Sequence, residues 1–154
     1  LTLLAASVTP AELPPDWHFL WDERAAILEY DGGAGAEANA RAMTDAAGRA
    51  TSGEVTRAVR ASSSGAGPIA EGAWLGLSAT GIEVVAPTVV EAATGLLAKL
   101  LTPEHELVTV LEGEDATPED TRCIHEWLEQ HCAGVVAEVH AGGQPLYPYL
   151  FSID

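Results

Sequence analysis

The clearest pattern of apolar and polar positions lies in the last third of the chain. Residues 106–111 (ELVTVL) are mostly apolar and β-branched, which predicts a buried strand. Residues 118–131 place apolar and aromatic side chains along one flank of a helix, and residues 133–140 (AGVVAEVH) predict a second strand. The order strand, helix, strand predicts a parallel β-α-β unit with a right-handed crossover.

The start of this helix is signalled locally. Thr117 is a favoured N-cap residue, Pro118 suits the first helical position, and acidic residues follow in the first turn. If the two strands are neighbours, the acidic turn after Leu111 and residues 142–144 lie at the same, carboxyl-terminal edge of the sheet. Open α/β sheets bind ligands at that edge.

The preceding pattern predicts the rest of the domain. Residues 53–60 alternate with a period of two, which favours a strand with Val55, Arg57 and Val59 on one face. Further predicted segments are a strand at 1–8, an aromatic cluster at 16–23, a helix at 37–49, a surface loop at 62–68, strands at 73–77 and 81–86, and a helix at 88–101. The expected fold class is α/β: a single mixed α/β domain over 1–154, with a C-terminal parallel β-α-β unit and residues 1–24 as an extension.

The chain closes on Gly142-Gly-Gln-Pro-Leu-Tyr-Pro-Tyr149, followed by a short predicted strand at 149–153. One interpretation is a Gly-Pro turn that closes a β-hairpin. The other is a contact surface, in which the two glycines offer backbone amides and the prolines hold the tyrosine rings in place. In that case Tyr147 is the expected contact and Tyr149 the expected core residue.

Composition limits the classes of function. A hydrophobic fraction of 47% over 154 residues is typical of a globular domain. The formal charge of −16, from 7 basic and 23 acidic residues, disfavours binding to nucleic acid or anionic lipid. No window approaches the roughly 18 apolar residues of a membrane span. We therefore expect a cytoplasmic protein with reduced cysteines, and the missing initiator Met indicates a piece of a longer chain.

Candidate chemistry is sparse. Cys123 and His131 are eight residues apart on the predicted helix, too far to share one zinc ion, and Cys123 and Cys132 are likewise too far apart for a disulfide. The acidic turn at 112–115 could hold a hard cation such as Mg²⁺, or be an ordinary solvated turn. The glycine-rich loop at 31–35 lacks the remainder of a phosphate-binding motif, and no catalytic triad is legible. We predict no metal site and no catalytic residue.

Four segments carry a family resemblance. They are residues 38–47 (ANARAMTDAA), 53–60 (GEVTRAVR), 107–115 (LVTVLEGED) and 142–149 (GGQPLYPY). They resemble, in order and spacing, the C-terminal region of the dihydroxyacetone-kinase-like family, whose best-known member is the A subunit of fatty acid kinase. The resemblance covers residues 29–154.

The resemblance implies a multidomain, ATP-dependent kinase of lipid metabolism. Its N-terminal domain would bind ATP and Mg²⁺, and its C-terminal region would engage a separate, DegV-like B subunit that carries the fatty acid. This chain would then be the non-catalytic docking domain, without a cofactor of its own, and homodimers would form through the parent protein. The alternative is a small-molecule-binding regulatory domain that uses the same sheet edge. The candidate partner- or ligand-binding residues are Glu112, Gly113, Glu114, Asp115, Gly142, Gly143, Gln144, Tyr147 and Tyr149.

Overall fold

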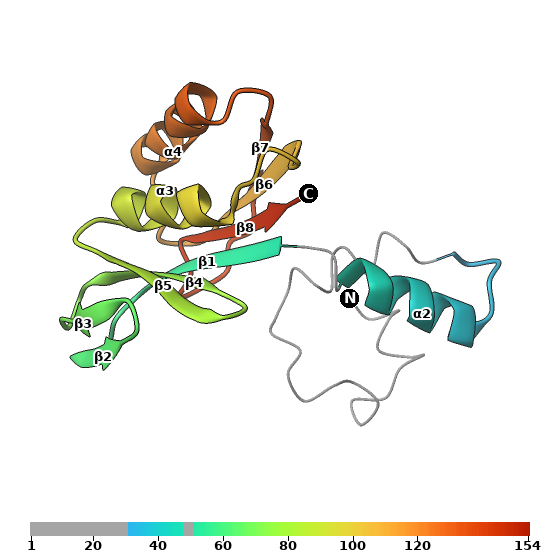
Figure 1. The fold of residues 1–154 in the computed structure, drawn as a ribbon, viewed down its shortest axis with the longest axis horizontal. Coiled ribbons are helices and arrows are strands. Elements are labelled where there is room, and N and C mark those ends of the chain that lie inside the picture. The colour runs from blue at the N-terminus through green and yellow to red at the C-terminus, as the bar shows by residue number, and fades with distance from the viewer. Residues whose placement is uncertain (1–30, 48–50) are drawn as a thin grey trace. The chain divides into compact units, whose positions relative to one another are not determined.

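The computed structural model describes residues 31–47 and 51–154 (Figure 1). The chain divides into two compact units, residues 1–50 and 51–154, which are described separately. The single domain expected over 1–154 stays a prediction. The strand expected at 1–8 and the aromatic cluster expected at 16–23 lie outside the described residues.

In the first unit, the predicted helix after the glycine-rich loop is confirmed as α2 (Ala36–Ala47). Asn39 is buried and fixes the entry to this helix. Its Nδ2 donates to the carbonyl of Asp31 at 2.9 Å, and its Oδ1 accepts from the amide of Asp31 at 3.0 Å. The loop therefore forms the helix entry, held by one amide side chain.

The second unit is built on a six-stranded mixed sheet in the order β5-β4-β1-β8-β6-β7. Its strands are β1 (Thr51–Arg57), β4 (Trp74–Ser78), β5 (Gly81–Ala86), β6 (Leu107–Glu112), β7 (Val136–Ala141) and β8 (Tyr149–Ile153). β6 and β7 are parallel, and the other neighbours are antiparallel. The α/β class and the strands expected at 73–77, 81–86 and 149–153 are confirmed.

The C-terminal β-α-β unit is also confirmed. The helices α3 (Val89–Leu100) and α4 (Pro118–His131) lie side by side on one face of the sheet (Figure 1). Helix α4 connects β6 to β7, whose register pairs Leu107 with Val136 and Glu112 with Ala141. Both β7 and β8 pair with β6, on its two sides. The hairpin interpretation of the C-terminal segment is therefore wrong, because this segment crosses the end of β6 to reach β8.

The main core lies between the helices and the sheet. Its fully buried side chains come from β1, β8, β6, α3 and α4, and include Val55, Phe151, Val108, Leu96, Leu97, Ile124 and Leu128. Helix α3 packs closely because two strands carry glycine beneath it. A Cβ on Gly53 would lie 2.9 Å from Leu96 Cδ2, and one on Gly76 would lie 3.2 Å from the carbonyl oxygen of Ala92. The glycine of the GEVT segment is thus a packing residue.

The caps of α4 follow the sequence prediction. Thr117 is the N-cap, and its Oγ1 accepts from the amide of Asp120 at 3.1 Å. The hydroxyl in turn donates to the Asp120 carboxylate at 2.7 Å, which satisfies groups that a helix start leaves unpaired. Cys123 and Cys132 are free thiols.

Two expectations for the first half of this unit need correction. The loop predicted at 62–68 contains a short hairpin, β2 (Ser62–Ser64) and β3 (Gly67–Ile69), because Gly65-Ala66 close a tight turn and Gly67 adopts a φ of 121°. The strand predicted at 53–60 ends at Arg57, so Val59 lies beyond it and is 87% exposed. Within the described residues, no helix has the length and apolar character needed to cross a membrane.

Candidate functional site

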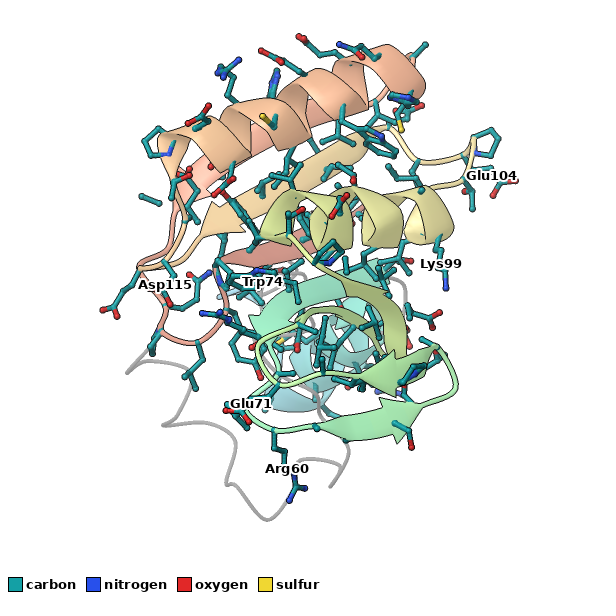
Figure 2. The ribbon with its side chains drawn as sticks, turned by 90° about the vertical axis from the view of Figure 1, so that its left-hand side faces the viewer. Arg60, Glu71, Trp74, Lys99, Glu104 and Asp115 are labelled. Atoms are coloured by element: carbon teal, nitrogen blue, oxygen red, sulfur yellow. The ribbon has the colours of Figure 1, made fainter. Side chains whose placement is uncertain are left out.

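Three of the sequence segments meet at one edge of the sheet. The parallel strands β6 and β7 both end there, as predicted, and β1 ends there too because β8 is antiparallel to both β1 and β6. We call this surface the motif edge and define it by residues 112–116 and 142–148 and the end of β1. In Figure 2, Asp115 lies on the other side of the unit from Lys99 and Glu104.

Backbone hydrogen bonds join the acidic turn to the C-terminal segment. They run from Gly113 N to Pro148 O at 2.9 Å, from Glu114 N to Gln144 O at 3.0 Å, and from Gly142 N and Gly143 N to Glu112 O at 2.8 and 2.9 Å. The two glycine amides are therefore occupied inside the edge. This corrects the expectation that they are offered to a ligand or partner.

Gly113 and Gln144 hold the two segments in close contact. A Cβ on Gly113 would lie 2.7 Å from the carbonyl oxygen of Gln144, and it would also clash with that of Tyr147. The side-chain amide of Gln144 donates to the carbonyls of Leu111 at 3.3 Å and Tyr147 at 3.1 Å. Both residues, predicted as binding residues, have clear structural roles in shaping the edge.

Tyr149 lies beneath the edge and is fully buried. Its ring stacks on Phe151 with 6.3 Å between centroids, and its hydroxyl lies 2.9 Å from Thr121 Oγ1. Thr121 Oγ1 donates to Glu112 Oε1 at 2.5 Å, so a hydrogen-bonded chain runs from β8 through α4 to the end of β6. Burial raises the pKa of the Tyr149 phenol. The expectation that Tyr149 belongs to the core is confirmed, and its place among the surface-contact residues is corrected.

The side chains that the motif edge presents are few. Glu114 and Asp115 are exposed, and Tyr147 is half-buried. Leu146 was missed by the sequence reasoning, yet its side chain is 72% exposed and its φ is 71°. Nothing in the local sequence signals a positive φ at a leucine, since that conformation is usually taken by glycine or asparagine.

Arg57 brings a fixed positive charge to the end of β1. Its guanidinium lies 5.6 Å from the centroid of the Trp74 ring, and its Nε donates to the carbonyl of Gly72 at 3.0 Å. Such contacts hold the long side chain in one arrangement although it is exposed. The edge therefore combines exposed carboxylates with one oriented arginine.

The structure lends no support to a metal site in the acidic turn. The Glu112 carboxylate is bonded to Thr121, whereas Glu114 and Asp115 are exposed. Across residues 31–47 and 51–154, no three His, Cys, Asp or Glu side chains gather closely enough to hold a metal ion.

An open groove of about 510 Å³ lies between α4 and β7, beside the buried end of the motif edge. Its lining residues are Glu112, Pro118, Thr121, Arg122, His125, Glu126, Glu129 and Val139. The charged walls partly pair with each other, as in the 2.9 Å contact of Arg122 with Glu126. Small-molecule sites are usually enclosed and mostly apolar, so this groove does not favour the regulatory alternative.

Together, the described fold and edge define a mixed α/β domain that presents a rigid, mainly acidic surface. Comparison with known proteins identifies its family. The model of the family formed by the C-terminal regions of fatty acid kinase A subunits and similar proteins matches residues 24–154, and the chain belongs to this family.

Curated relatives agree with this assignment in extent. The chain is 37% identical over 130 residues to an uncharacterized protein of Staphylococcus haemolyticus, covering 84% of this chain and 24% of that protein. Uncharacterized proteins of Staphylococcus epidermidis and Staphylococcus aureus (strain USA300) are 36% and 34% identical over 129 residues; each match covers 84% of this chain, and 23% and 24% of those proteins. The chain thus spans about a quarter of the length of these relatives.

Proposed function

We propose that this chain is the docking domain of a fatty-acid-kinase-like A subunit, in which it binds the separate, DegV-like B subunit that carries the fatty acid. The observation that carries this proposal is the meeting of three family segments at the motif edge. Most residues of these segments hold the edge together, and a few side chains are presented outward. This division of roles is what a preformed protein-binding surface requires.

The rigidity of the edge supports a role in binding. Each segment is held by hydrogen bonds to the other, and prolines flank the exposed part of the C-terminal segment. A surface that is already ordered loses less conformational entropy when a partner docks. The edge is therefore suited to binding without rearrangement.

The charge of the chain indicates the kind of partner. A formal charge of −16 and the exposed carboxylates of Glu114 and Asp115 favour a partner with a basic face. Such complementarity steers association and weakens as salt screens it. The Arg57 guanidinium would pair with a carboxylate or a carbonyl of the partner.

In this proposal the ATP- and Mg²⁺-binding groups belong to the N-terminal domain of the parent protein. The parent would be a cytoplasmic kinase of lipid metabolism, and any homodimer would form outside this chain. Phosphoryl transfer to the fatty acid carboxylate would then need the whole kinase, with this domain holding the B subunit within reach.

A binding titration tests the proposal. We expect calorimetry to show saturable, one-to-one binding of this chain to a fatty-acid-loaded B subunit encoded by the same genome, with an affinity that falls as salt rises. The same mixture supplied with ATP and Mg²⁺ should form no acyl phosphate. The absence of binding, or acyl phosphate formation by the purified chain, would contradict the proposed role.

A further inference from the structure

Leu146 combines two features that rarely occur together. Its backbone adopts a φ of 71°, and its side chain is 72% exposed. The left-handed conformation is disfavoured for residues with a Cβ, because this atom approaches the following carbonyl oxygen. Glycine or asparagine would adopt it with less strain, and neither would leave a large apolar side chain in water.

The strained conformation is fixed by its surroundings. Thr56 Oγ1, on β1, donates to the carbonyl of Leu146 at 2.8 Å. The Gln144 side chain holds the carbonyl of Tyr147 on the other side, at 3.1 Å. Pro145 and Pro148 restrict the backbone before and after these residues. Leu146 is therefore held outward by a rigid frame.

Exposed leucines are common on protein surfaces and usually need no explanation. Leu146 differs because the fold holds a strained backbone at the residue that it exposes. Strained conformations persist where surrounding structure dictates them, and they concentrate at ligand clamps and other functional sites. Its place beside the exposed carboxylates of the acidic turn makes it the apolar centre of the motif edge.

We propose that Leu146 is the apolar anchor of the motif edge and that it inserts into an apolar socket on the fatty-acid-carrying B subunit. This inference rests on the proposed function and specifies how the docking is made. Glu114 and Asp115 would face basic side chains around the socket, and Tyr147 would pack against its rim. A second copy of this chain suits the site less well, because it would bring another acidic turn to the same place.

The decisive variants are Leu146→Gly and Leu146→Asn. Both remove the apolar side chain and suit the positive φ, so the thermal midpoint should stay the same or rise. Affinity for the fatty-acid-loaded B subunit should fall at least about tenfold, as for an interface hot spot. Val136→Ala is the matched control, because Val136 is a 60% exposed apolar residue at the other end of β7. Its affinity should stay within about twofold of wild type.

Thr56→Val tests whether the orientation of the anchor matters. This substitution nearly preserves side-chain volume but removes the hydrogen bond to the carbonyl of Leu146. If the frame orders the anchor, affinity should fall about three- to tenfold although the leucine itself is intact.

The possible outcomes separate this inference from the proposed function. Wild-type binding with unchanged affinity in both Leu146 variants would overturn the anchor and leave the docking role standing. No binding by the wild-type chain would overturn both. Self-association of the wild-type chain that both variants abolish, measured by sedimentation, would show a second copy as the occupant and overturn the inference.

Discussion

The Tyr149→Ala variant is expected to lose about 3–5 kcal/mol of unfolding free energy, the cost of deleting a large buried aromatic side chain. Tyr149 is fully buried between the sheet and α4, and its ring stacks on Phe151. Its hydroxyl also contacts Thr121 at 2.9 Å and donates to the Thr117 carbonyl at 3.3 Å. Removing the ring therefore leaves a cavity and ends the polar link to the start of α4.

Denaturant unfolding of three variants resolves these contributions. Tyr149→Phe keeps the ring and should cost only about 1 kcal/mol, the typical contribution of a hydrogen bond. Tyr147→Ala is the matched control in the same segment, because this half-buried ring is not part of the main core. It should destabilise the fold much less than Tyr149→Ala. Equal losses for the two alanine variants would contradict the assigned roles.

The Gly113→Ala variant is expected to disrupt the motif edge at a cost of about 1–3 kcal/mol, the usual range for forcing extra atoms into a packed site. The added Cβ would meet the backbone carbonyls of Gln144 and Tyr147, which cannot move aside as a flexible side chain can. The acidic turn and the C-terminal segment would have to separate. The hydrogen bond from Glu114 N to Gln144 O would be weakened or lost.

Gly65→Ala is the control for this substitution, because a Cβ there would have no neighbour within 4 Å. Amide hydrogen exchange in both variants would locate the effect. We expect faster exchange at Glu114 and Gly142 in Gly113→Ala, and wild-type exchange at these amides in Gly65→Ala. Wild-type stability and exchange in Gly113→Ala would show that the two segments are less tightly joined than described.

The sequence was most informative where its signals are local. The boundaries of α4 follow from Thr117 and Pro118, which act within one turn of the helix. The apolar strand before α4 and the one after it were predicted within a few residues. Because a β-α-β crossover has a preferred hand and short connections, these elements also predicted the shared edge.

The sequence was less informative where distant contacts decide the outcome. The position of β8 between β1 and β6 depends on residues about a hundred positions apart, which no local pattern reveals. That pairing buries Tyr149, and it also turned the expected hairpin tip into a crossing segment. Leu146 takes its positive φ within a frame that includes Thr56, a residue 90 positions earlier in the chain. A serine-rich stretch likewise concealed the β2–β3 hairpin.

Amide chemical-shift mapping of this chain, titrated with the fatty-acid-loaded B subunit, tests the central claim most directly. The docking role predicts the largest shift changes at residues 112–116 and 142–147. It predicts little change at residues 99–106, which lie between α3 and the start of β6, away from the motif edge. Shift changes centred on residues 99–106, or on the groove between α4 and β7, would contradict the motif edge as the docking surface.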